Sequence, residues 1–157
     1  MSCKTSGEYT EGVEHFDPSE LEQVSYHLGV VFAFAEIVGS GVKRMALSSP
    51  LTLELYDEII DRVHILAKEY GTVLYVDDDF LETKLFNPDY TRGKRVVHIA
   101  RDQDTVEAYK ALRERKRRHL AEGTLTYDVE TEVAWEMGRL LSYSDDAIEG
   151  LLVKPRF

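Results

Sequence analysis

Apolar residues recur every three or four positions over much of the chain, which is the spacing of one face of an α-helix. The first such stretch runs over 18–38, where Asp17 can cap the helix and Pro18 suits its first position. Its second half, residues 28–38, is apolar nearly all round. Helices of that kind are buried between layers or against another subunit, so the pattern predicts a helix that takes part in self-association.

Later stretches with the same spacing predict four further helices, over residues 52–70, 103–122, 128–141 and 145–152. The last two are separated by a short turn and are expected to pack as an αα-hairpin. Three short runs predict strands over residues 42–47, 72–76 and 95–100, of which the second is rich in β-branched and aromatic residues.

The order of these elements predicts an α/β fold: a small three-stranded sheet flanked by helices, with the αα-hairpin as a C-terminal layer. A helix joins the first two strands, and such a crossover favours parallel strands, so the sheet is expected to be at least partly parallel. The length of 157 residues fits a single domain over 1–157, in which 1–15 is expected to be a flexible N-terminal segment.

Polar residues follow the predicted strands at the positions where open parallel sheets bind ligands. Ser48 and Ser49 follow the first strand and precede a helix N-terminus, which attracts anions. Arg101 and Asp102 follow the third strand and would join them if that strand is also parallel. A strand over 81–86 would instead pair with the third strand and direct its carboxyl end elsewhere. The hypothesis is an anion-binding site built from these four residues.

Asp77, Asp78 and Asp79 follow the second strand. Adjacent carboxylates supply the hard oxygen ligands that Mg²⁺ or Ca²⁺ prefers, and a cation would relieve their mutual repulsion. The simpler interpretation is a solvated acidic turn. A metal site at 77–79 is therefore one hypothesis of two.

The segment Val73–Asp79 resembles the first strand and acidic pocket of response-regulator receiver domains, with a looser similarity up to Tyr109. That resemblance implies a phospho-accepting aspartate after the third strand and a lysine after the fifth. From Arg101 onward the chain reads as helices, which leaves no place for either residue. The sequence does not predict a receiver domain.

Residues 137–152 resemble a helix-turn-helix, with Gly138 allowing the two helices to approach and Ser142 in the turn. The resemblance implies DNA binding through the second helix. That helix carries Asp145 and Glu149, whose charges repel phosphates, and no donors near its start. A packed αα-hairpin is the preferred interpretation.

The formal net charge of −10 disfavours binding to nucleic acid and to anionic membranes. The basic run over 113–119 is the exception. Its side chains point in every direction on a helix, so a solvated helix is expected. The alternatives are a phosphate or RNA contact, or an acidic patch on another subunit.

A cytoplasmic location is expected from three features. The most apolar run is about half the length needed to span a bilayer. Residues 1–15 lack the apolar core of a signal peptide. Cys3 is the single cysteine, so a disulfide framework is excluded.

The histidines and one acidic residue complete the list of candidate groups. His64 is expected at the surface, His98 in the core, and His27 without a partner at metal-binding spacing. Glu36 is expected to be exposed; if buried, its pKa would be raised and could serve acid–base chemistry.

The sequence contains no nucleotide-binding loop and no nucleophile motif. We therefore expect a non-catalytic binding or protein-interaction module. It would form a homo-oligomer through the 18–38 helix or the C-terminal helices. The alternative is a metal-dependent enzyme, or a binder of a phosphorylated or anionic small molecule, that uses residues 77–79.

Overall fold

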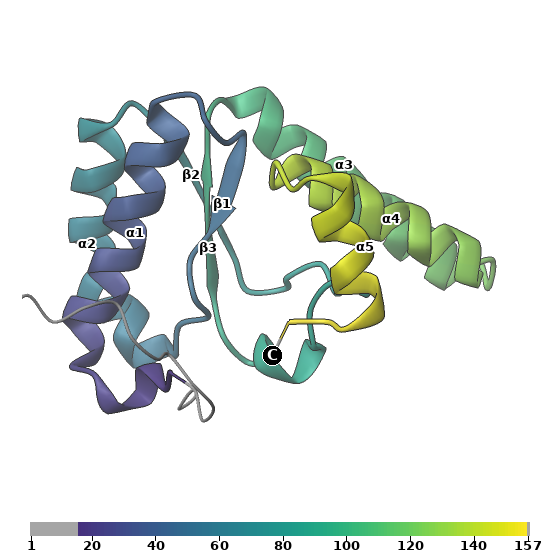
Figure 1. Cartoon of the computed structure of the whole chain (residues 1–157), viewed down its shortest axis with the longest axis horizontal. Helices are drawn as coiled ribbons and strands as arrows, with labels where there is room; N and C mark the ends of the chain where they lie inside the picture. The colour runs from purple at the N-terminus through teal and green to yellow at the C-terminus, as the bar shows by residue number, and fades with distance from the viewer. Residues whose placement is uncertain (1–15, 157) are drawn as a thin grey trace, which may run out of the picture.

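The protein has a three-stranded sheet at its centre, with two helices against one face and three against the other (Figure 1). The structure, a computed structural model, describes residues 16–156. The strands are β1 (Met45–Leu47), β2 (Val73–Asp77) and β3 (Val96–Ala100), in the order β1-β3-β2. The α/β class and the three strands are confirmed.

The expectation of a partly parallel sheet is wrong, because β3 lies between β1 and β2 and pairs antiparallel with both. The predicted crossover does make β1 and β2 run in the same direction, but they are not neighbours. The connection over 78–95 returns the chain to the middle of the sheet, where β3 takes the place expected for β2. The carboxyl end of β3 therefore lies at the opposite end of the sheet from those of β1 and β2.

The first helical layer consists of α1 (Gln23–Gly39) and α2 (Leu53–Glu69), which lie side by side (Figure 1). Together with one face of the sheet they bury a core that includes Val31, Ile59 and Ile99. Thr52 caps α2 by accepting a hydrogen bond from the backbone N–H of Leu55.

The first predicted helix begins five residues later than expected, and 18–38 is not one continuous helix. Asp17 caps only a short 3-10 turn, η1 (Pro18–Glu20), after which Leu21 is extended. The Glu22 carboxylate then accepts hydrogen bonds from the N–H groups of Val24 and Ser25 and starts α1. The first N–H groups of a helix need acceptors from outside the helix. Both Asp17 and Glu22 can supply them, and α1 begins after Glu22.

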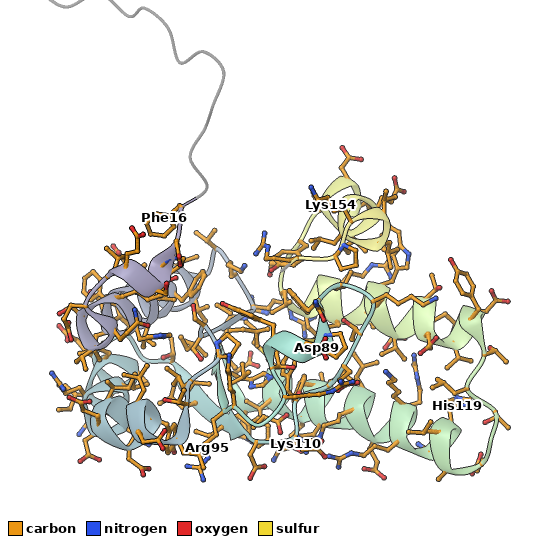
Figure 2. The ribbon with its side chains drawn as sticks, turned by 90° about the horizontal axis from the view of Figure 1, so that it is seen from below. Phe16, Asp89, Arg95, Lys110, His119 and Lys154 are labelled. Carbon is orange, nitrogen blue, oxygen red and sulfur yellow. The ribbon has the colours of Figure 1, made fainter. Side chains whose placement is uncertain are left out.

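The second layer consists of α3 (Gln103–Ala121), α4 (Tyr127–Leu140) and α5 (Asp145–Val153). Asp102 caps α3 by accepting a hydrogen bond from Thr105 N–H, and Ser144 caps α5 by accepting one from Ala147 N–H. A second core, around Tyr109, Met137 and Ile148, fills the space between these helices and the sheet. The predicted packing of α4 against α5 is confirmed. Residues 119–127, at the far tip of the α3–α4 pair, extend well beyond the sheet (Figure 2).

Residues 78–95 link β2 to β3 without a strand and contain one short helix, η2 (Pro88–Tyr90). The C-terminal segment lies along this link: Arg156 N–H donates to Leu85 O over 3.1 Å, and Asn87 N–H donates to Arg156 O over 3.2 Å. These two bonds fix the backbone at Arg156 beside Phe86.

Within residues 16–156, none of the helices is both long and apolar enough to cross a membrane. The expectations for segment 1–15 and for Cys3 fall outside the described residues.

Candidate functional site

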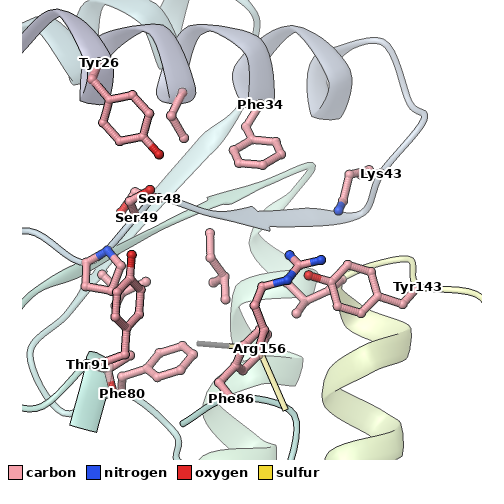
Figure 3. A pocket seen from close by; sticks show the side chains of 16 residues that line it. Tyr26, Phe34, Lys43, Ser48, Ser49, Phe80, Phe86, Thr91, Tyr143 and Arg156 are labelled. Carbon is pink, nitrogen blue, oxygen red and sulfur yellow. The ribbon is translucent and has the colours of Figure 1, made fainter. Parts of the chain in front are cut away.

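A pocket of about 250 Å³ opens where the two helical layers part, beside the free edge of β1 (Figure 3). Four segments line it: α1, the start and end of β1, the 80–96 region, and the C-terminal part from Leu141 to Arg156. We call it the aromatic pocket. Its lining residues are Tyr26, Val30, Phe34, Lys43, Leu47, Ser48, Ser49, Pro50, Phe80, Phe86, Tyr90, Thr91, Val96, Leu141, Tyr143 and Arg156.

The walls are mainly apolar. Phe34 comes from α1, whereas Phe80 and Phe86 come from the link, where their ring centres lie 6.3 Å apart. Leu47 and Val96 belong to neighbouring strands. Ligand pockets typically combine such a lining with a few placed polar groups.

One end of the pocket is cationic. Lys43 Nζ lies 4.9 Å from the ring centre of Tyr143 and 5.7 Å from that of Phe34, and the Arg156 guanidinium lies on the same side (Figure 3). Burial, followed by repulsion from Arg156, lowers the pKa of Lys43. None of the described residues that line the pocket is acidic. In a protein with a net charge of −10, two cations around an apolar pocket form a local exception.

The other end carries hydroxyl groups. Tyr26 points its hydroxyl toward Ser48 and Ser49 (Figure 3). Ser48 is nearly buried, and its Oγ accepts a hydrogen bond from Val97 N–H over 2.9 Å. This bond extends the pairing of β1 with β3 and leaves the hydroxyl hydrogen of Ser48 free to be donated.

The structure separates the four residues predicted to bind an anion. Ser48 and Ser49 line the aromatic pocket, but Arg101 and Asp102 lie at the opposite end of the sheet because β3 is antiparallel. Asp102 accepts hydrogen bonds from Thr105 as the cap of α3, and these bonds, first of all the one from the Thr105 side chain, lower the pKa of Asp102. The placement of these four residues therefore does not support a single anion-binding site.

The first of the three aspartates has a structural environment. Asp77 is 2% exposed, and its Oδ2 accepts a hydrogen bond from the Tyr109 hydroxyl over 2.5 Å and lies 2.7 Å from Arg113 Nη1. Its Oδ1 accepts from Asp79 N–H. Asp79 also pairs with Arg117. Arg113 and Arg117 thus balance the charges of Asp77 and Asp79, the role for which a metal cation was expected.

In the part of the chain that the structure describes, no three metal-ligating side chains cluster. Binding of Mg²⁺ or Ca²⁺ at 77–79 stays a prediction, and the geometry does not favour it.

The basic run on α3 is largely engaged in contacts within the protein. Arg113 pairs with Asp77, Arg115 with Glu136, and Arg117 with Asp79. Lys116 Nζ donates to the carbonyl of Glu82 over 2.6 Å. The basic run was expected to be solvated. Most of its side chains instead hold the β2–β3 link and α4 against α3.

The remaining candidates lie where the residue pattern indicated. His64 and Glu36 are exposed, and His98 is fully buried between the rings of Tyr109, Phe80 and Tyr75. Burial, the largest cause, lowers the pKa of His98 to about 4, although the Asp77 carboxylate raises it.

Sequence reasoning missed Lys43, Tyr143 and Arg156. Lys43 and Arg156 have no motif around them, and Tyr143 lies in the turn of the 137–152 stretch, whose pattern indicates helix packing and not a ligand. The single available signal was that Ser48 and Ser49 sit at a strand end. What completes the pocket is the pairing of the C-terminal segment with residues 85–87.

Comparisons with protein families, with curated proteins and with solved structures found no match to this chain. Its function is inferred below from the geometry of the site.

Proposed function

We propose that this protein is a non-catalytic binding module whose ligand is a small organic anion held in the aromatic pocket. The observation that carries the proposal is the pair Lys43 and Arg156, two cations beside a pocket whose described lining holds no acid. Lys43 is half-buried and Arg156 is exposed. Like charges placed near each other repel, and an anion between them would relieve that repulsion.

The chemistry of the lining supports binding rather than acid–base catalysis. The described lining residues include no carboxylate, imidazole or thiol. The Lys43 amine, which can serve as a general base when neutral, lies at the opposite end of the pocket from Ser48 and Ser49 (Figure 3). A guanidinium and an ammonium, in contrast, form charge-assisted hydrogen bonds with carboxylate or phosphate groups.

The test is calorimetric titration of the purified protein with a panel of aromatic and aliphatic carboxylates and phosphates. We expect at least one anion to bind, and Lys43→Met and Arg156→Gln to weaken it by about tenfold or more, because a hydrogen bond to a charged group contributes about 1.5–3 kcal/mol. Lys68→Met, an exposed lysine on α2, is the matched control. Binding that survives both pocket variants would place the ligand elsewhere and contradict the proposal.

Self-association is a second candidate function, favoured by an exposed apolar groove between α1 and α2. Phe32 is 46% exposed and Ile65 64% exposed. On the same side of α1, Gly29 has open space beside it, which would let a second α1 approach closely. The groove favours α1 over the C-terminal helices as the contact. Its lining residues are Leu28, Gly29, Phe32, Arg62, Ile65 and Leu66.

Light scattering after size-exclusion chromatography tests this candidate. We expect a dimer at tens of micromolar that Ile65→Lys converts to a monomer. Leu120→Lys is the matched control, since Leu120 is equally exposed but lies near the tip of the α3–α4 pair. A wild-type monomer at high concentration would exclude self-association and leave the anion proposal intact.

A further inference from the structure

We infer that the ligand of the aromatic pocket is a hydroxyaryl carboxylate, bound with its carboxylate at Lys43 and Arg156 and its hydroxyl at Tyr26 and Ser49. The inference rests on the proposed function and adds the chemical class of the ligand. It follows from how the polar groups of the pocket are distributed, and from its size.

The polar groups stand at two separate ends (Figure 3). Lys43, Arg156 and Tyr143 lie on one side, and Tyr26 with Ser48 and Ser49 on the other. Most of the remaining lining is apolar; the exceptions are Tyr90 and Thr91, and the Thr91 hydroxyl donates to Pro88 O. A ligand that matches this distribution has an anionic group, a flat apolar body and a neutral hydrogen-bonding group in that order.

The size of the pocket limits the body of the ligand to about one ring. The volume of about 250 Å³ is below the lower end, roughly 300 Å³, of pockets for drug-sized ligands. The Phe34, Phe80 and Phe86 rings favour an aromatic body, because aromatic pairs gain about 0.5–1.5 kcal/mol beyond the area that they bury.

The cationic end favours a carboxylate. The Arg156 guanidinium offers a planar fork that matches the two oxygens of a carboxylate, and Lys43 adds a single point charge. A carboxylate is also smaller than a phosphate group, which suits a pocket of about 250 Å³ that must hold the ring as well.

The hydroxyl end can recognise a hydroxyl group. Among residues 16–156, no hydrogen bond to the Ser49 hydroxyl or the Tyr26 hydroxyl is present, whereas Ser48 is already engaged with Val97 N–H. Each of these groups can both donate and accept. A ligand hydroxyl placed there gains one neutral hydrogen bond or more, and an unsubstituted ring gains none.

The experiment is a calorimetric comparison of 3-(4-hydroxyphenyl)propionate, 3-phenylpropionate and phenyl phosphate as ligands of the full chain. We expect the hydroxylated acid to bind about three- to tenfold more tightly than its unsubstituted partner, the range of one neutral hydrogen bond. We expect the Tyr26→Phe/Ser49→Ala double variant to abolish that preference while it still binds 3-phenylpropionate. Tyr127→Phe is the matched control, because Tyr127 is an exposed tyrosine at the tip of the α3–α4 pair.

The outcomes separate the two proposals. If none of the panel of organic anions binds, the proposed function fails. If both propionates bind equally, or if the preference survives in the double variant, the inference fails and the proposed function stands. If phenyl phosphate binds most tightly, the carboxylate assignment is overturned. Melting curves of each variant without ligand show whether it is folded.

Discussion

The Asp77 carboxylate is buried at the end of β2, and its charge is balanced by groups from α3. Tyr109 donates its hydroxyl hydrogen to Asp77 and accepts a hydrogen bond from Leu81 N–H over 3.0 Å. Burial, followed by the hydrogen bond to Asp77, raises the pKa of Tyr109, so the hydroxyl stays protonated. A single side chain thus connects β2, the link that follows it, and α3.

Tyr109→Phe is expected to lower the free energy of unfolding by about 2 kcal/mol. The variant removes a donor from a buried carboxylate and leaves the Leu81 N–H without an acceptor, and each such loss costs about 1–3 kcal/mol. Urea denaturation followed by circular dichroism measures the change. Tyr127→Phe is the control, since Tyr127 is 75% exposed. A change below about 0.5 kcal/mol in Tyr109→Phe would contradict this account.

His98 is expected to make the protein less stable in acid. Burial lowers its pKa in the folded state to about 4, below the value of about 6.5 for an unfolded chain. The unfolded state therefore binds more protons between these values, so stability is full above about pH 6.5 and falls as the pH decreases toward 4. The contribution at stake is about 3 kcal/mol, from the size of this pKa difference.

Urea denaturation at several pH values between 7 and 4.5 tests this expectation. The His98→Leu variant should lose less stability over this range than the wild type, whatever its absolute stability. His64→Leu removes an exposed histidine and should keep the wild-type slope. Equal slopes for the wild type and His98→Leu would show that His98 titrates normally.

At the scale of elements, the contact between α4 and α5 depends on the absence of a side chain at Gly138. A Cβ added there would lie 2.6 Å from Cγ1 of Ile148 and 2.7 Å from its Cδ1. Ile148 is fully buried in the second core, so it has no solvent to move into. Gly138 is the small residue on which the resemblance to a helix-turn-helix depends. In this structure it allows α4 and α5 to pack as an αα-hairpin.

Gly138→Ala is expected to destabilise the protein by about 1–3 kcal/mol, the usual cost of overpacking a filled core. Gly150→Ala is the matched control, because Gly150 lies in α5 with open space at its Cβ position. That variant should gain up to about 1 kcal/mol from helix propensity. Melting temperatures of the two variants should change in opposite directions, and a neutral Gly138→Ala would mean that Ile148 moves easily.

At the scale of the whole molecule, the aromatic pocket lies beside β1, where α1 meets the C-terminal part of the chain. Its two cations come from the segment before β1 and from the last described residue of the chain. Such a cluster costs folding stability without a ligand, and functional sites are often retained at that cost.

Lys43→Met is expected to leave the free protein as stable as the wild type or up to about 1 kcal/mol more stable, and to weaken anion binding. The substitution removes repulsion with Arg156 and keeps contacts with the Phe34 and Tyr143 rings, because methionine sulfur packs well against aromatic groups. Denaturation without ligand and titration with ligand measure the two effects. A loss of more than about 1 kcal/mol in the free protein would indicate a structural role for Lys43 instead.

The residue pattern alone determined the secondary structure, because helix and strand signals are local. The periods of apolar residues located four of the five helices to within a residue or two, helped by Asp102 and Ser144, which start two of them. The pattern failed at residues 18–22, where two carboxylates compete to start a helix within one turn. It also placed the start of the first strand at residue 42, whereas β1 begins at Met45. The burial of His98 also followed from its position in an apolar strand.

The tertiary structure alone decided the strand order and the site. Nothing local specifies that β3 enters between β1 and β2, and this single choice moves Arg101 and Asp102 to the far end of the sheet. The aromatic pocket depends on contacts between residues far apart in the chain, such as Lys43 and Tyr143, which are one hundred positions apart. Contacts of that kind are set by how whole layers pack, and so no short stretch of the sequence carries them.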